Sequence, residues 1–167
     1  MSVLTLRPAQ SKDAPEIARV QQESWSAAYS GLLPSSFPLR SEQERIAIWM
    51  QRLVDWPCHT ILAEIDDGLV GFLFWHPELR SQALLKSLYL HPFFWNQGIG
   101  HQLLQQGLDD MRTEQMQRVD LWVLANNLRA EHFYLREGFR YDGRHHQQMV
   151  GQGQYQQRHM FRSLSLR

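Results

Sequence analysis

Two glycines near the middle of the chain have the spacing of a phosphate-binding turn. Gly98 and Gly100 stand in the run WNQGIGH, between an apolar segment and residues that repeat at helical spacing. Without side chains in the way, backbone N–H groups at a helix N-terminus can converge on an anion, and the helix dipole attracts it. A dinucleotide-binding loop is an alternative, but it needs a third glycine where this chain has Leu103. A plain tight turn is the other alternative.

A second pattern covers residues 127–139, directly after the apolar run Val119–Leu124. Together the two patterns resemble the GNAT acetyltransferase superfamily. Its phosphate loop reads Arg/Gln-x-x-Gly-x-Gly/Ala, and its last helix reads Asn-x-x-Ala-x-x-Phe-Tyr-x-x-x-Gly-Phe. The residues that match the helix pattern are Asn127, Ala130, Phe133, Tyr134, Gly138 and Phe139. The run 25–34 is also similar to members that acetylate small amines or peptides, so the resemblance covers nearly the whole chain.

The resemblance implies transfer of the acetyl group of acetyl-CoA directly to a primary amine of a small molecule or peptide. It implies no covalent enzyme intermediate. Separately from the resemblance, no metal is expected. The pantetheine arm of acetyl-CoA would lie between two splayed parallel strands and bond to the backbone near Leu88 and Leu90. The implied contacts of the loop and of the last helix with the coenzyme are Gln97, Gly98, Gly100, His101 and Asn127. Asn127 could equally cap its own helix.

The resemblance also implies a catalytic role for Tyr134. A phenol with a pKa near 10 can donate a proton to the thiolate that leaves. The alternative interpretation is an aromatic core residue beside Phe133. The backbone N–H of Leu88 or Leu90 would stabilise the negative charge that develops on the acyl oxygen.

No general base can be assigned from the sequence. Many relatives carry a glutamate on the strand that here reads Ala83–Leu90, where this chain has Lys86 and Ser87. A lysine is a poor base unless its pKa is lowered. The remaining candidates are residues near strand ends and one tyrosine that could act through water: His76, Glu78, His91 and Tyr29.

The first position of the phosphate loop departs from the family pattern, because Trp95 stands where arginine or glutamine is usual. The backbone donors do not depend on this side chain, so we expect phosphate binding to survive. A side-chain contact is lost, however. A non-catalytic module that binds or senses acyl-CoA is therefore the alternative function.

The elements that must position these residues can be read along the chain. Apolar alternation predicts a strand at Ser2–Arg7. Asp13 is expected to cap a first helix, and Ser41 with Glu44 forms a capping box for a second. The run Gly31–Pro38 is predicted as a loop. A hairpin is predicted at Thr60–Ile65 and Leu69–Trp75, turning on Asp66-Asp67-Gly68 because glycine tolerates positive φ.

The second half alternates strands and helices. Strands are predicted at Ala83–Leu90 and Val119–Leu124, and helices at Gly98–Met116 and Leu128–Glu137, the latter ended by Gly138. A last strand pair is expected at Phe139–Gln148 and Tyr155–Leu164, around Gly151-Gln152-Gly153. The order β-α-α-β-β-β-α-β-α-β-β predicts an α/β fold of GNAT type. Its mixed, mostly antiparallel sheet would carry a splayed central parallel pair and about four helices.

Composition limits the remaining choices. The 167 residues include 17 basic and 17 acidic side chains, and such a neutral chain is not expected to bind nucleic acid or a membrane surface. The length fits one domain, residues 1–167. The single cysteine, Cys58, and the absence of an apolar leader favour a cytoplasmic protein.

His145 and His146 are adjacent on a predicted strand and cannot both face one ion. The expected partners are acetyl-CoA, an amine and, as an open alternative, a second copy of the chain.

Overall fold

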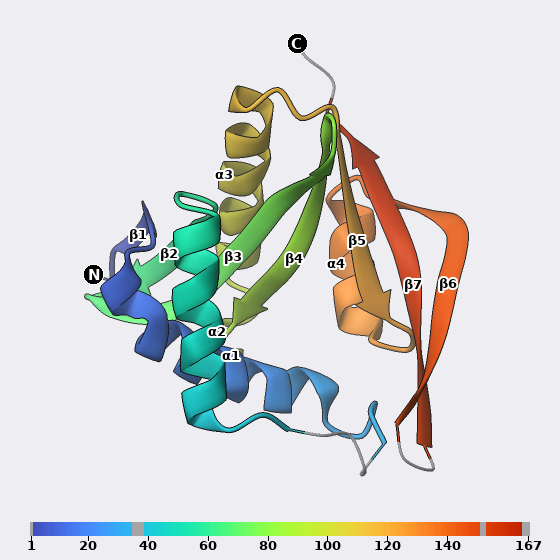
Figure 1. Cartoon of the computed structure of the whole chain (residues 1–167), viewed down its shortest axis with the longest axis horizontal. Coiled ribbons are helices and arrows are strands. Elements are labelled where there is room, and N and C mark those ends of the chain that lie inside the picture. Colours follow the sequence, from blue (N-terminus) through green and yellow to red (C-terminus); the bar gives the residue numbers. More distant parts are fainter. Residues whose placement is uncertain (1, 35–38, 151–152, 165–167) are drawn as a thin grey trace.

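The computed structural model describes residues 2–34, 39–150 and 153–164, which build one seven-stranded sheet with helices on both faces (Figure 1). The strand order is β1-β2-β3-β4-β5-β7-β6, and the predicted succession of strands and helices is confirmed. Two short 3₁₀ turns, η1 (Ser11–Asp13) and η2 (Pro92–Phe94), complete it. The strands are β1 (Leu4–Pro8), β2 (Thr60–Ile65), β3 (Gly68–Leu79), β4 (Gln82–Leu90), β5 (Arg118–Leu124), β6 (Arg140–Val150) and β7 (Gly153–Ser163). The helices are α1 (Ala14–Tyr29), α2 (Glu42–Asp55), α3 (Ile99–Thr113) and α4 (Leu128–Arg136).

The parallel pair β4–β5 is joined only at its beginning. Its register runs from Gln82 opposite Arg118 to Leu84 opposite Asp120, and every other neighbouring pair in the sheet is antiparallel. Beyond these residues the two strands run apart, as Figure 1 shows. The predicted splayed parallel pair is therefore confirmed, and its open end is where backbone groups of both strands are free to meet a ligand.

The two faces of the sheet carry separate hydrophobic cores. α3 packs its stripe Leu103, Leu104 and Leu108 against β3, where Trp75 is fully buried. On the opposite face, α1 and α2 cover a core around Trp49, which is also fully buried. Complete burial of a large apolar side chain contributes about 1.5–3 kcal/mol. These cores hold β3 and β4 rigidly between helices, so that the end of β4 is a fixed platform.

Local capping signals are confirmed in α2 and α4 but not in α1. The Glu44 amide donates to Ser41 Oγ at 3.2 Å, and the Ser41 amide donates to Glu44 Oε2 at 3.3 Å. Gly138 ends α4 with φ +87°. Asp13 stands at the N-cap position of α1, as predicted, but its side chain makes no hydrogen bond to the first turn of the helix. Its carboxylate pairs with Arg7 and accepts the Gln10 amide at 2.7 Å, because an arginine on β1 lies within reach.

The β2–β3 hairpin is confirmed, but Gly68 does not adopt the positive φ angle that was predicted for it. Asp66 and Asp67 carry the positive φ angles, 51° and 66°, and Gly68 already pairs with Ile65 as the first residue of β3. Such a turn needs positive φ at both central residues, which aspartate tolerates. β3 also continues past its predicted end, through Pro77 to Leu79.

Parts of two predicted turns lie outside the described residues. They are residues 35–38 of the Gly31–Pro38 loop and residues 151–152 of the last hairpin. Within the described ranges, no helix combines the length and apolar character needed to cross a membrane.

Candidate active site

A cavity of about 510 Å³ opens where β4 and β5 diverge. Its walls come from the ends of both strands, the first turn of α3, one side of α4 and the last turns of α1. Elements that are far apart in the sequence therefore meet at the open end of the parallel pair.

The first turn of α3 presents unpaired backbone donors to this cavity. The first hydrogen bond inside the helix runs from the Gln102 amide to the Gly98 carbonyl at 3.1 Å, so the amides of residues 99–101 have no partner within the helix. Gly98 has a φ of +81°, and a Cβ placed on it would meet nothing within 4 Å. Residues 98–101 line the cavity, so the three free N–H groups border a space that suits an anion.

The Trp95 side chain lines the same cavity and carries a cation on the face of its ring. Its Nε1 donates to the Leu90 carbonyl at 2.7 Å, and the Arg129 guanidinium carbon lies 3.6 Å from the centroid of its ring. Arg129 Nη2 also approaches Asn96 Oδ1 at 3.5 Å, and burial lowers the pKa of Arg129. Arg129 lines the cavity and pairs with no carboxylate among the described residues. A positive charge thus stands next to the free amides.

α4 contributes Asn127 and Tyr134. The Asn127 side chain is buried and accepts a hydrogen bond from the Ala130 amide, so it caps α4 as one of the two predicted roles requires. The Tyr134 ring packs edge-on against Phe133 and Phe139, with centroids 5.2 and 5.4 Å away. Burial, with a smaller effect of the phenol of Tyr29, raises the pKa of Tyr134 well above its usual value. Tyr134 is therefore a neutral phenol, able to donate, across the ordinary pH range.

The wall of the cavity opposite α4 is polar but carries no obvious general base for the amine. Tyr29 and Tyr89 both line this wall, and burial raises the pKa of both hydroxyl groups. Ser24 is 1% exposed, and its Oγ has no hydrogen-bond partner among the described residues. A buried hydroxyl that lines a cavity without a partner is a place where a ligand or water is expected.

The cavity collects most of the predicted site residues. Seven line it: Leu88, Leu90, Gly98, Gly100, His101, Asn127 and Tyr134. Gln97 is exposed and does not line it, because its Nε2 donates to the Phe93 carbonyl at 3.2 Å instead. His101 Nδ1 lies 2.7 Å from Glu137 Oε1, which ties the first turn of α3 to the end of α4.

Of the four candidate bases, only Tyr29 lines the cavity. His76 stacks on Trp56 with ring centroids 5.4 Å apart, and Glu78 is exposed at the far end of β3. The His91 Nε2 atom lies 3.5 Å from a Glu23 carboxylate oxygen. The geometry therefore brings no free carboxylate or imidazole to the wall opposite α4.

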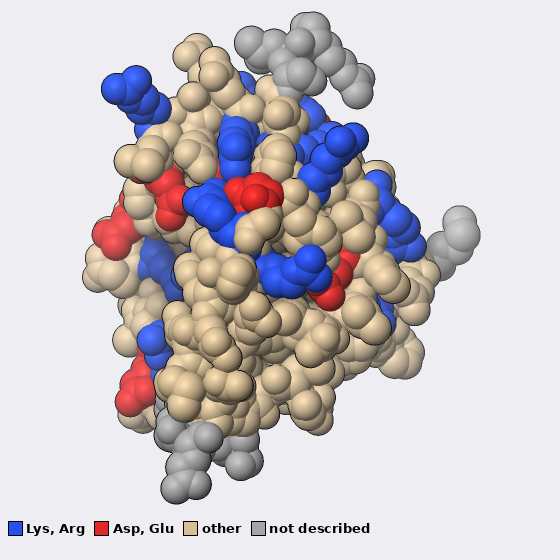
Figure 2. Space-filling model, turned by 90° about the vertical axis from the view of Figure 1, so that its right-hand side faces the viewer, with Lys and Arg blue, Asp and Glu red and all other residues tan. Residues whose placement is uncertain are grey.

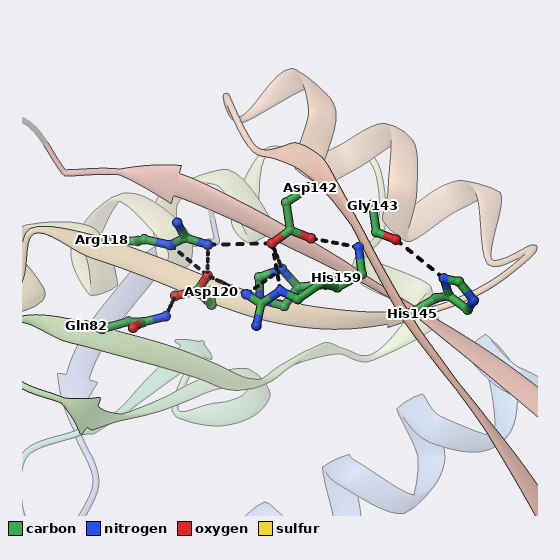
Figure 3. Close-up of polar contacts among 8 residues, drawn as sticks. Gln82, Arg118, Asp120, Asp142, Gly143, His145 and His159 are labelled. Atoms are coloured by element: carbon green, nitrogen blue, oxygen red, sulfur yellow. Dashed lines mark hydrogen bonds and ion pairs between the residues drawn. The ribbon is translucent and has the colours of Figure 1, made fainter.

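A second cluster of charged residues lies outside the cavity, where β5, β7 and β6 meet (Figure 3). His159 is 2% exposed and lies between two carboxylates, with Nε2 3.1 Å from Asp120 Oδ1 and Nδ1 2.8 Å from Asp142 Oδ2. Arg118 pairs with Asp120 at 2.6 Å. The cluster joins three strands by mutual pairing, which explains these residues without a catalytic role. Among the described residues, no group of three or more His, Cys, Asp or Glu could hold a metal ion.

Sequence reasoning missed several residues that line the cavity. They are Ser24, Tyr89, Trp122 and Arg129. One signal was available for Arg129, because an aromatic ring in a phosphate loop can carry an arginine on its face. No comparable signal marks Ser24, whose burial depends on how α1 docks onto β4.

Comparisons with known proteins agree with this geometry. Residues 17–139 match the Acetyltransferase (GNAT) family. An uncharacterized N-acetyltransferase of Archaeoglobus fulgidus is 27% identical over 144 residues, which cover 82% of this chain and 93% of that protein.

Solved structures share the fold. The PaiA N-acetyltransferase of Thermoplasma acidophilum, crystallised with coenzyme A, superimposes with a TM-score of 0.76 at 20% identity, covering 96% of this chain and 99% of its own. A putative acetyltransferase of Salmonella typhimurium, crystallised with acetyl-CoA, gives a TM-score of 0.76 at 16% identity and covers 99% and 96%. With its splayed strands, its glycine turn and the family match over most of its length, this chain belongs to the GNAT family of acetyltransferases.

Proposed function

We propose that the protein transfers the acetyl group of acetyl-CoA directly to a primary amine of a small molecule or peptide. The observation that carries the proposal is a single cavity that connects free amides at the start of α3 with the neutral phenol of Tyr134. Structural neighbours crystallised with coenzyme A or acetyl-CoA support the choice of acetyl donor.

The cosubstrate contacts follow from the donors that the cavity presents. The amides of Ile99, Gly100 and His101 and the guanidinium of Arg129 would hold the diphosphate, since anions bind to free amides at a helix N-terminus. The backbone of Leu88 and the amide of Leu90 would align the pantetheine arm along β4, because β5 no longer pairs with this part of the strand and only the Leu90 carbonyl is bonded to Trp95.

Acetyl-CoA supplies an activated acetyl group as a thioester. The amine nitrogen forms a bond to the acyl carbon, the carbon–sulfur bond breaks, and Tyr134 donates its phenolic proton to the sulfur. The backbone N–H of Leu88 or Leu90 stabilises charge on the acyl oxygen. The only carboxylate and imidazole lining the described cavity, Glu137 and His101, pair with each other. The amine therefore attacks as the free base, its surplus proton passes to water, and the Tyr134 phenolate takes a proton back from water, which restores the acid for the next turnover.

Incubation with acetyl-CoA and a panel of amines tests the proposal, with free coenzyme A thiol and acetylated amine measured together. We expect both products in equal amounts. A thermal shift measures binding separately, because a ligand at 100 times its dissociation constant adds about 2.7 kcal/mol of stability. Binding without release of coenzyme A with any amine would instead identify a non-catalytic acyl-CoA module.

A further inference from the structure

The cavity has a second half, away from the helix turn that would bind the diphosphate. We call it the acceptor half, and its described lining residues are Ser24, Ala28, Tyr29, Lys86, Ser87, Tyr89 and Trp122. Tyr89 packs against the core under α1 and α2, whereas Leu88 and Leu90 pack against the core of α3. The acceptor half therefore opens on the α1 and α2 face of the sheet.

Lys86 gives the acceptor half a positive charge. It is exposed at an irregularity of β4, where Trp75 pairs with Leu85 and Phe74 pairs with Ser87, so that Lys86 has no partner on β3. Its ammonium forms no ion pair or hydrogen bond with any described residue. The lining residues of this half include no carboxylate. The cation consequently faces the space that the amine must enter.

A second cation stands behind Tyr89. The Arg52 guanidinium lies 4.9 Å from the Trp49 ring centroid and 5.4 Å from that of Phe74. Arg52 is half-buried and has no carboxylate partner among the described residues, although proteins usually pair charges that are withdrawn from water. Burial, followed by the nearby charge of Arg40, lowers the pKa of Arg52, while the phenol of Tyr89 acts in the opposite direction.

The surroundings do not supply the missing negative charge. Glu23 on α1 does not line the cavity and is paired with Arg19 and His91. The undescribed segments 35–38 and 151–152 contain no acidic residue. In Figure 2, which looks onto β6 and β7, charged side chains of both signs gather in the upper part, above a largely uncharged area. None of the described residues supplies a carboxylate to Lys86 or Arg52, so the anionic group of a ligand can pair with them.

We propose that the acceptor is an amine that carries an anionic group, a carboxylate or a phosphate-type group, and that Lys86 binds this group. Arg52 adds attraction from behind Tyr89. This inference rests on the proposed acetyl transfer and names its substrate class. Lys86 also disfavours an ammonium beside it and so lowers the pKa of the amine. A cation near the acceptor thus increases the fraction of reactive free base in a site without a general base.

Matched acceptors test the inference by isolating charge. We would compare β-alanine, 2-aminoethylphosphonate and the neutral β-alaninamide as acceptors, measuring kcat/KM by release of coenzyme A and expressing it per concentration of free-base amine, since the three amines differ in pKa. Wild-type protein should favour the two anionic amines by about 10-fold, as expected for one charge-assisted hydrogen bond. Lys86→Gln should remove most of this preference through KM, and Lys86→Glu should reverse it. A preference for only one of the anions identifies the source of the charge and supports the proposal.

The chain offers a matched control, since Lys12 is its only other lysine and lies exposed in η1, outside the cavity. Lys12→Gln should leave the preference unchanged. Arg52→Gln should reduce it, and Arg52→Lys should restore it partly, provided that thermal melts show both variants folded. Equal use of anionic and neutral amines by the wild type, or equal losses for both in Lys86→Gln, overturns the inference and leaves acetyl transfer intact. Acetylation of no amine at all overturns the proposed function together with this inference.

Discussion

The Arg129 guanidinium lies 3.6 Å from the ring centroid of Trp95, at the position where the family pattern has a polar or basic side chain. The ring is fixed by its hydrogen bond to the Leu90 carbonyl. A cation stacked on an indole is held in one orientation at little cost, since the ring face is electron-rich. The chain therefore lacks the usual side chain in the loop but keeps a positive charge there, delivered from α4.

Replacing Arg129 tests this compensation. Arg129→Ala should weaken acetyl-CoA binding about 10-fold, because a charge-assisted contact to the diphosphate is lost, and should reduce the salt dependence of the dissociation constant. Isothermal titration at two salt concentrations measures both effects. Arg112→Ala is the control, since Arg112 sits in the last turn of α3 and pairs with Asp109. An unchanged affinity in Arg129→Ala would show that the stacked cation does not reach the coenzyme.

Substitutions of Trp95 test whether its ring acts by orienting Arg129 or by contacting the coenzyme itself. Trp95→Ala should resemble Arg129→Ala, because the guanidinium loses the surface that orients it. Adding Trp95→Arg to Arg129→Ala should recover most of the affinity, since the charge then comes from the loop itself. If the double variant binds no better than Arg129→Ala, the loop position and Arg129 do not serve the same group.

The two glycines of the loop should respond differently to alanine. Gly98 has a φ of +81°, which costs a residue with a Cβ about 1–2 kcal/mol, so Gly98→Ala should lower the melting temperature and coenzyme affinity together. A Cβ on Gly100 in α3 would lie 3.5 Å from the Phe133 ring of α4, which is an ordinary van der Waals distance. Gly100→Ala should therefore fold normally and bind acetyl-CoA, as melts and titrations can show. Equal stability losses in both variants would contradict the assignment of the left-handed position.

Tyr134→Phe should separate chemistry from binding. The ring keeps its packing against Phe133 and Phe139, so coenzyme affinity and melting temperature should change little. Turnover should fall by about 10²-fold or more, the usual contribution of a positioned acid. Steady-state kinetics and titration on the same preparation give both values. Unchanged turnover would remove Tyr134 from the mechanism.

The order of elements and the loop at Gly98 were predictable because local chemistry dictates them. Apolar spacing marks α3, the Ser41 and Glu44 box starts α2, and Gly138 ends α4. Asp13 shows where local reasoning fails: its carboxylate is drawn to Arg7 on β1, a residue that local capping rules do not consider. The predicted role of the hairpin glycine was also wrong. Asp66 and Asp67 adopt the positive φ angles of the turn, so Gly68 is free to pair as the first residue of β3.

The site was only half predictable. Motifs identified Gly98, Gly100 and Tyr134, because each has a fixed place in a family pattern. The stacking of Arg129 on Trp95 and the unpartnered Ser24 depend on how α4 and α1 dock onto the sheet. That information is carried by tertiary contacts and not by spacing along the chain.

The pH dependence of turnover should have one limb. The rate should rise with pH as more of the amine becomes free base, because no group on the acceptor wall takes its proton. Burial raises the pKa of Tyr134 above its usual value near 10, so the required acid stays protonated and no falling limb should appear below about pH 10. Initial rates between pH 6 and about pH 10 check this with one acceptor. A decline that begins near pH 8 would mean that another group is the acid.

The charged cluster around His159 should control acid stability. Burial acts to raise the pKa of Asp142, but hydrogen bonds from Arg144 and His159 outweigh it and lower the pKa to about 2. A lowered pKa means that the folded state favours the carboxylate, so its stabilisation is complete above the unfolded value, near 3.8, and is lost as the pH falls toward 2. Asp142→Asn should therefore lower the melting temperature at pH 7 by about 2–4 °C, the effect of about 1 kcal/mol in a chain of this size once solvent screening of this exposed residue is allowed for.

The melting temperature of Asp142→Asn should approach that of the wild type as the medium becomes more acidic. Protonation of Asp142 removes from the wild type the same negative charge that the substitution has already removed. Melts at half-unit steps from about pH 6 down to about pH 3 measure the convergence of the two curves. Asp109→Asn serves as the control, because Asp109 is largely exposed and its pairing with Arg112 should be worth little. Parallel curves for Asp142→Asn and the wild type would mean that Asp142 contributes nothing through its charge. The contact of β6 with β5 and β7 would then not depend on the charge of Asp142.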